Sequence, residues 1–129
     1  MSILKKLLVV DGHYGIRKGL VLRFEGSEKF LVVGEAENGE KALKKVKDLD
    51  PDVVILDFSM PRENGLKVAS KISKISSQVK IVLCSLYDLE EIGLTGKDLL
   101  EYNIAGYIPK LELNEESLIN LLESLVTIS

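Results

Sequence analysis

The chain has 129 residues, of which 46% are hydrophobic and 29% charged, and its net charge is −3 at neutral pH. This size and balance predict one globular domain over residues 1–129. A mildly acidic domain is poorly suited to bind nucleic acid by itself, because neutralising phosphates requires a basic surface. No apolar stretch approaches the roughly 20 residues that span a membrane. Cys84 is the single cysteine, which excludes an internal disulfide and fits a cytoplasmic location.

Five short apolar runs alternate with longer amphipathic segments along the chain. Each run is rich in valine, isoleucine or leucine, as expected of a strand that is buried on both faces. Strand and helix alternation of this kind predicts an α/β domain with a five-stranded parallel sheet and helices on both faces. The predicted strands are Leu7–Val10, Phe30–Val33, Val53–Leu56, Val79–Leu83 and Ala105–Ile108.

Helical spacing of apolar residues marks the segments between the strands. Asn114 is expected to cap the last helix, and the acids that follow it suit the positive end of a helix dipole. Gly93 and Gly96 interrupt the segment from Asp88 to Tyr102, which predicts a distorted or late-starting helix there. The lysines of residues 41–47 are expected to form a solvated helix face. The predicted buried stripes are Ile16, Leu20 and Phe24; Ala42, Leu43, Val46 and Leu49; Leu66, Ala69, Ile72 and Ile75; and Leu118, Leu121, Leu122 and Leu125.

Polar side chains follow four of the predicted strands, at the next residue or the one after it. They are Asp11, Asp57, Ser85 and Lys110. Parallel sheets bind ligands beyond the carboxyl ends of their strands, so these side chains are expected to meet at one edge. Two carboxylates are oxygen ligands that suit magnesium, and a carboxylate beside a cation and a lysine can attack a phosphoryl group.

Four segments carry a resemblance to a known family. They read LLVVDGHYGIRKGL, VVGEAENGEKAL, PDVVILDFSMPRENGLKV and AGYIPK. Together they resemble the receiver domain of bacterial two-component response regulators, and the resemblance covers nearly the whole chain. It implies the chemotaxis-like fold, a flavodoxin-like (βα)5 sheet with strand order 2-1-3-4-5. The first two segments most resemble receivers that carry a helix-turn-helix output domain, and none lies within these 129 residues.

The resemblance also implies a phosphorylation site with a bound magnesium ion. Asp57 corresponds to the aspartate that accepts the phosphoryl group, inside the segment DVVILDFSMPRENG. Asp11 corresponds to an acid that holds magnesium, usually through water. The backbone carbonyl of Ser59 corresponds to a further metal ligand, and Asp57 completes the metal site.

Three more positions correspond to the parts that respond to phosphorylation. Ser85 is the switch hydroxyl, Lys110 is the lysine that pairs with the phosphoryl group, and Tyr107 is the aromatic residue that changes rotamer. The implied partners are a sensor histidine kinase and an output domain or partner protein, with homodimer formation on phosphorylation. Members of this family catalyse their own phosphotransfer but are not usually classed as enzymes.

Gly12 is the main departure from the family pattern. It stands where the family usually has a second acid that binds the metal directly, so weakened magnesium binding is expected. Glu35, which follows the second predicted strand, and Glu63, in the acceptor loop, are the acids that could compensate.

Three further departures concern the switch and the output face. Leu86 follows the switch serine where small residues are usual, and Leu111 follows Lys110 where many receivers have a cis proline. The span from Ser85 to Tyr107 is also a few residues longer than usual. Of the four departures, Gly12 and Leu86 motivate an alternative function, a binding module that acts without phosphorylation, because Leu86 is expected to crowd the acceptor. A small hydrolase or flavin carrier is a third alternative, for which the sequence supplies no general base or phosphate loop.

Three residues at or near the predicted site also have interpretations that involve no site chemistry. Asp11 could instead cap the helix that follows it. His13 has no second histidine or nearby cysteine, so it is interpreted as a loop residue rather than a zinc ligand. Cys84 is interpreted as a small apolar core residue.

Overall fold

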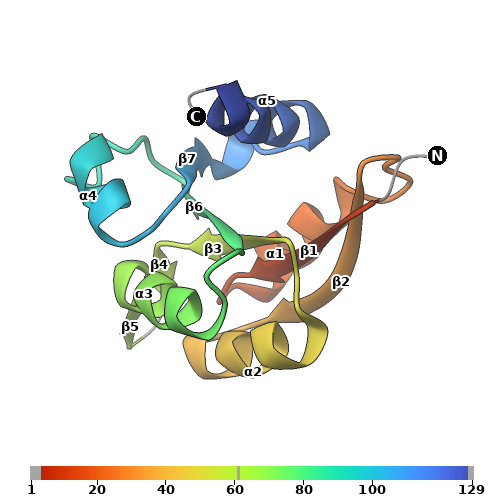
Figure 1. Cartoon of the computed structure of the whole chain (residues 1–129), viewed down its shortest axis with the longest axis horizontal. Helices are drawn as coiled ribbons and strands as arrows, with labels where there is room; N and C mark the ends of the chain where they lie inside the picture. The colour runs from red at the N-terminus through yellow and green to blue at the C-terminus, as the bar shows by residue number, and fades with distance from the viewer. Residues whose placement is uncertain (1–3, 61, 128–129) are drawn as a thin grey trace.

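The computed structural model describes residues 4–60 and 62–127 and contains a five-stranded parallel sheet (Figure 1). The strand order is β2-β1-β3-β6-β7, which confirms the predicted order once the short hairpin β4-β5 is set aside. The sheet strands are β1 Lys5–Val10, β2 Phe30–Ala36, β3 Val53–Asp57, β6 Lys80–Ser85 and β7 Gly106–Pro109. The hairpin strands are β4 Ser59–Met60 and β5 Glu63–Asn64. The helices are α1 Tyr14–Leu22, α2 Gly39–Leu49, α3 Gly65–Ile75, α4 Gly96–Glu101, the 3-10 turn η1 Lys110–Glu112 and α5 Glu115–Thr127.

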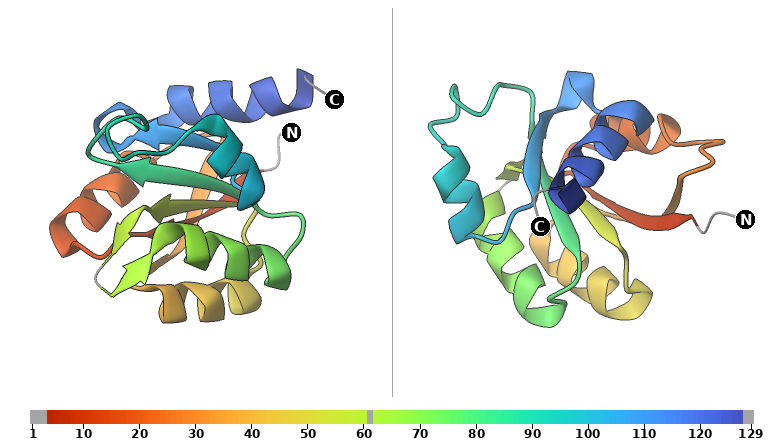
Figure 2. Two further views of the ribbon diagram at one scale, coloured as in Figure 1. Left: turned by 90° about the vertical axis from the view of Figure 1, so that its left-hand side faces the viewer. Right: turned by 45° about the horizontal axis from the view of Figure 1, so that its top comes forward.

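Alternate residues of each central strand enter two separate hydrophobic cores, one on each face of the sheet. Leu7 and Val9 of β1 pack with α1 and α5, together with the buried thiol of Cys84. Leu8 and Val10 pack on the other face with α2, α3 and α4. Figure 2 shows α2 and α3 side by side on the face opposite α5. This period-2 division explains why the strands are apolar along their whole length.

The predicted elements are mostly present, with corrections at their ends. Strand β2 continues three residues beyond the predicted end at Val33, because Gly34 to Ala36 pair with Leu8 to Val10 after a shift of register. Phe24 is buried but lies beyond the end of α1. Ile75 was expected in the buried stripe of α3 and is 37% exposed, because it is the last residue of that helix.

Helix starts follow the expected capping chemistry. The Asn114 side chain accepts a hydrogen bond of 2.9 Å from the amide of Ser117, as predicted for the start of α5. Helix α4 starts late, as predicted, with Thr95 and Asp98 forming a capping box. Before it, the segment of residues 86–95 has no long helix, and Gly93 adopts a positive φ of 78°. Within the described residues no helix is long and apolar enough to cross a membrane.

Candidate functional site

Four polar side chains meet at the carboxyl edge of the sheet. Asp11 follows β1, Asp57 ends β3, Ser85 ends β6 and Lys110 follows β7. All four are at least 95% buried. They border one cavity of about 480 Å³. The prediction that the sheet brings two carboxylates, a hydroxyl and an ammonium together is therefore confirmed in its geometry.

Lys110 joins the two carboxylates. Its Nζ lies 2.6 Å from Asp11 Oδ2 and 3.2 Å from Asp57 Oδ1. Burial disfavours the ammonium, but its contacts with Asp11 and Asp57 outweigh this cost, so the pKa of Lys110 is raised. The ammonium therefore stays charged at neutral pH and offsets part of the negative charge in the site.

The Asp57 carboxylate is buried, with 5% of the residue exposed. Burial raises its pKa, Lys110 opposes that rise, and the negative charge of Asp11 adds to it. One oxygen, Oδ1, also accepts a hydrogen bond of 3.1 Å from the amide of Ser59. The carboxylate is thus poorly hydrated, which leaves it a better nucleophile than a fully solvated acid.

Ser85 and Tyr107 are linked through the segment that follows β6. The amide of Tyr87 donates to Ser85 Oγ at 3.2 Å. The hydroxyl of Tyr107, on β7, donates to the backbone carbonyl of Tyr87. Ser85 and Tyr107 therefore both form hydrogen bonds with the backbone of Tyr87. A movement of either side chain changes the hydrogen bonding of the segment that follows β6.

Apolar side chains form much of the cavity wall. Leu86 borders the cavity and is 52% exposed, and that it crowds the acceptor stays a prediction. Ile16 of α1 and Ile92 of the long segment before α4 also border it. Leu111 lies next to Lys110 but points away from the buried site, being 78% exposed. The described residues contain no cis peptide bond, so the cis proline geometry of the family has no counterpart here.

The oxygen donors of the site come from two carboxylates and the backbone near Ser59. Gly12 borders the cavity and contributes no carboxylate. Asp11 Oδ2 is buried and has no hydrogen bond, only its ion pair with Lys110. In the described part of the chain no three acids, histidines or cysteines cluster as a metal site. Two carboxylates and a backbone carbonyl are oxygen ligands that suit magnesium, so Asp11, Asp57 and the Ser59 carbonyl would be the residues to hold it, which stays a prediction.

The two acids considered as substitutes for the missing ligand are engaged elsewhere, so that part of the prediction is wrong. Glu35 pairs with Arg17 at 3.1 Å and with Lys18 at 2.8 Å. Burial opposes ionisation of Glu35, but these two partners outweigh it and lower its pKa. Glu63 Oε2 accepts a hydrogen bond of 2.6 Å from the amide of Gly39. Neither carboxylate borders the cavity.

The sequence analysis did not single out Arg17, and it interpreted His13 as a loop residue. Arg17 is 8% exposed, and its Nη1 donates to the backbone carbonyl of Asp11 at 2.9 Å. His13 caps α1, because its Nδ1 accepts from the amide of Ile16 at 3.1 Å. Asp11 therefore does not cap the helix; its Oδ1 accepts from the amide of His13 at 2.9 Å. Arg17 lies three residues before Leu20, which belongs to the predicted buried stripe, so the two share one side of the helix. This spacing was the signal in the sequence that could have predicted the burial of Arg17.

The fold is a doubly wound parallel sheet with two buried acids and a lysine at its carboxyl edge, which is the arrangement expected from the sequence resemblance to receiver domains. The family model of the response regulator receiver domain matches residues 7–123. The chain therefore belongs to the response regulator receiver domain family and is a receiver domain of two-component signalling.

Curated relatives support this membership over most of the chain. The nitrate/nitrite response regulator protein NarL of Escherichia coli is 34% identical over 116 residues, which cover 90% of this chain and 52% of that protein. The oxygen regulatory protein NreC of Staphylococcus haemolyticus is 36% identical over 115 residues, with 88% and 52% covered. The chain thus spans about half the length of the curated relatives it matches.

Solved structures agree with the fold. The signal receiver domain of a putative response regulator NarL from Mycobacterium tuberculosis has a TM-score of 0.77 and 29% identity, covering 93% of this chain and 98% of that chain. The response regulator domain of CheB from Thermotoga maritima has a TM-score of 0.74 and 26% identity, covering 98% and 94%.

Proposed function

We propose that Asp57 accepts a phosphoryl group from a phosphohistidine of a sensor kinase, and that this modification switches the binding of a partner protein or output domain. The observation that carries the proposal is the buried Asp57 at the end of β3, in contact with Lys110 and open to a cavity of about 480 Å³. The chain then acts as a signalling module rather than as an enzyme.

The transfer itself requires one bond to form and one to break. A carboxylate oxygen of Asp57 attacks phosphorus, the P–N bond to the donor imidazole breaks, and the imidazole leaves with the bonding electron pair and takes up a proton. The product is an acyl phosphate on Asp57. Lys110 offsets the negative charge that gathers on the phosphoryl oxygens.

Magnesium is proposed as the cofactor, bound weakly by Asp11, Asp57 and the backbone carbonyl of Ser59. When bound, it supplies positive charge that offsets the phosphoryl oxygens. Gly12 removes one ligand from the usual set. Because magnesium readily keeps several waters, weak binding rather than no binding is expected.

The switch is proposed to start at Ser85. Its hydroxyl can turn to donate to a phosphoryl oxygen. Ser85 Oγ then no longer accepts the hydrogen bond from the amide of Tyr87. Tyr107, which holds the carbonyl of the same residue, then changes its environment. The change reaches the surface of β7 and the segment before α4, where a partner or a second copy of the chain would respond.

Mass spectrometry tests the acceptor. Incubation with a small phosphodonor and magnesium should add one phosphoryl group to the wild type and none to Asp57→Asn. Asp88→Asn changes an exposed acid near the same loop and serves as the control. A mass gain that persists in Asp57→Asn would show that another residue is the acceptor.

A binding module that works without phosphorylation is the second candidate. Gly12 at the cavity and the Lys110 bridge between both acids favour it, because the site then has an internal cation and only two carboxylates. No mass gain in the wild type, together with unchanged partner binding in Asp57→Asn, would select this candidate.

A further inference from the structure

Basic residues are concentrated on two neighbouring helices. Helices α2 and α3 together contain seven lysines and two acids, a net charge of +5. The whole chain has a net charge of −3, so the other residues carry −8. The acidic remainder is strongest after residue 85, where nine acids face two lysines. The seven lysines, called here the α2–α3 basic face, are Lys41, Lys44, Lys45, Lys47, Lys67, Lys71 and Lys74.

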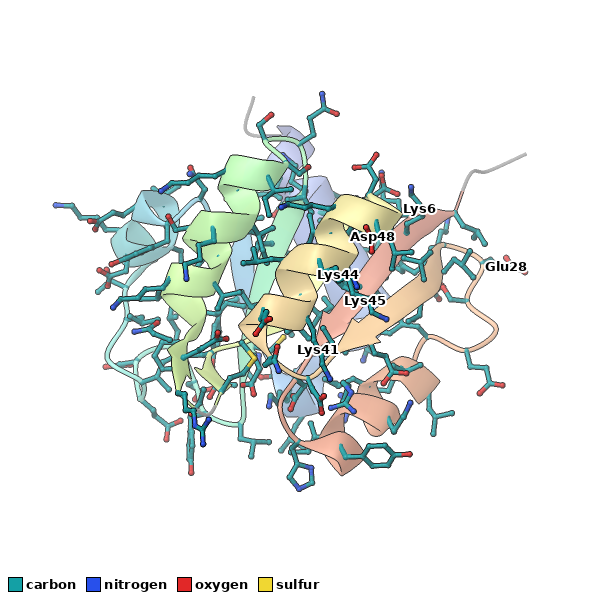
Figure 3. The ribbon with its side chains drawn as sticks, turned by 90° about the horizontal axis from the view of Figure 1, so that it is seen from below. Lys6, Glu28, Lys41, Lys44, Lys45 and Asp48 are labelled. Atoms are coloured by element: carbon teal, nitrogen blue, oxygen red, sulfur yellow. The ribbon has the colours of Figure 1, made fainter. Side chains whose placement is uncertain are left out.

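This basic face is open to solvent and almost unpaired. Six of the lysines are exposed and Lys45 is half-buried. Figure 3 shows α2 in front of the sheet, with Lys41, Lys44 and Lys45 labelled beside β2. Within the described parts of the chain, Lys41 is the one member with an ion pair, to Glu37. The remaining charges are available to a partner.

Two hollows border the face. One, of about 730 Å³, lies between α2 and β2, and its lining contains five basic residues, including Lys41, Lys44 and Lys45, and the three acids Glu35, Glu37 and Asp48. The other, of about 550 Å³, lies beside α3 and is lined by Arg62 and two lysines of that helix. The hollow beside α3 has the higher share of basic residues among its charged residues, because Arg62, Lys67 and Lys71 line it against one acid, Glu63.

The spacing of the lysines is unfavourable for the free helices. Lys67 and Lys71 are four residues apart, as are Lys41 and Lys45, and like charges at this spacing repel. No acid of α3 compensates, since the helix contains none. A bound acidic surface would relieve this repulsion.

We propose that the α2–α3 basic face docks an acidic surface or segment of a partner protein. This inference is independent of phosphorylation and stands on charge complementarity. Nucleic acid fits less well, because the two helices contain neither arginine nor aromatic residues for base or phosphate recognition. A membrane surface fits less well too, because Ile75 is the single exposed large apolar residue of these helices.

The test is a titration of the intact chain with deca-glutamate at low salt, followed by backbone amide NMR. We expect saturable, one-to-one shifts that concentrate on α2 and α3 and that weaken as salt rises. The triple variant Lys67→Glu/Lys71→Glu/Lys74→Glu should lose binding at least tenfold. The matching variant with glutamine should also lose binding, which separates lost attraction from added repulsion.

A matched control has the same overall charge as the triple lysine-to-glutamate variant of α3. Lys5→Glu/Lys29→Glu/Lys80→Glu also changes three exposed lysines that lie outside both helices, and it should bind nearly as the wild type does. Circular dichroism and urea unfolding confirm that each variant is folded. Equal losses in both triple variants, or shifts spread over all lysines, would overturn the proposal. So would tighter binding of a short DNA duplex at the same salt, or salt-sensitive self-association seen by sedimentation.

Discussion

Replacing Lys110 with methionine removes the charge that separates the two buried acids. Asp11 and Asp57 are 1% and 5% exposed, and both contact the lysine ammonium. Solvent screening is therefore slight, and two carboxylates would remain buried without a cation. Removing one partner of a buried ion pair typically costs about 3–5 kcal/mol of stability. That is a large part of the roughly 5–15 kcal/mol by which a domain is usually stable.

The loss should depend on pH in a defined direction. Without Lys110, the folded-state pKa of Asp57, already raised by burial, rises further. A folded pKa above the unfolded value means that the folded protein binds more protons, so stability is lost as pH rises from about 3.9 towards neutrality. The variant should therefore differ least from the wild type near pH 4 and most near pH 7.

Urea unfolding at several pH values measures both effects. Lys80→Met, at an exposed lysine that begins β6, should stay within about 0.5 kcal/mol of the wild type. The double variant Lys110→Met/Asp11→Asn should recover part of the stability, because only one buried charge remains. If Lys110→Met costs less than about 1 kcal/mol at pH 7, well below the usual cost of breaking a buried pair, the ion pairs do not hold the acids as described.

Three more outcomes are expected. Gly12→Asp should raise magnesium affinity by at least about 10-fold in calorimetric titration, and equal affinities would mean that Gly12 is not a missing ligand. Tyr107 ring signals in NMR should shift when a metal fluoride mimics the phosphoryl group, and unchanged signals would favour the phosphorylation-independent module. Gly65→Ala should cost about 1–3 kcal/mol in urea unfolding, because its Cβ would lie 2.8 Å from the Asp57 carbonyl oxygen. Gly19→Ala, with nothing within 4 Å, should leave stability unchanged or raise it, and a similar loss at both glycines would refute the steric argument.

The sheet and its polar edge could be predicted because both follow from the pattern of apolar and polar residues that are close together in the sequence. Strands such as Val53–Asp57 are buried on both faces, which makes them continuous apolar runs that sequence inspection finds directly. Parallel pairing then brings their carboxyl ends together whatever the loops do. Asp11, Asp57 and Lys110 therefore meet as expected, with Lys110 at the start of the 3-10 turn that follows β7.

The missed features depend on contacts between segments far apart in the sequence. The extension of β2 to Ala36 requires pairing with β1, and its Gly-Glu-Ala end has no strand-like pattern of its own. Glu35 looked like a spare acid near the site because it follows an apolar run. Its partners, Arg17 and Lys18, come from α1. Only the folded structure shows that these two side chains form ion pairs with Glu35.

Arg17 gives the clearest physical reason why Gly12 need not disable the site. Its guanidinium holds the Asp11 carbonyl at 2.9 Å while Glu35 fixes its other side at 3.1 Å. The backbone carbonyl directly before Gly12 is therefore held by a buried cation. Gly12 is not among the described residues with positive φ, so an aspartate can take the same backbone conformation without strain. A carboxylate introduced at Gly12 would thus start from an anchored loop, and the gain in magnesium affinity should reflect the added ligand rather than a rearranged backbone.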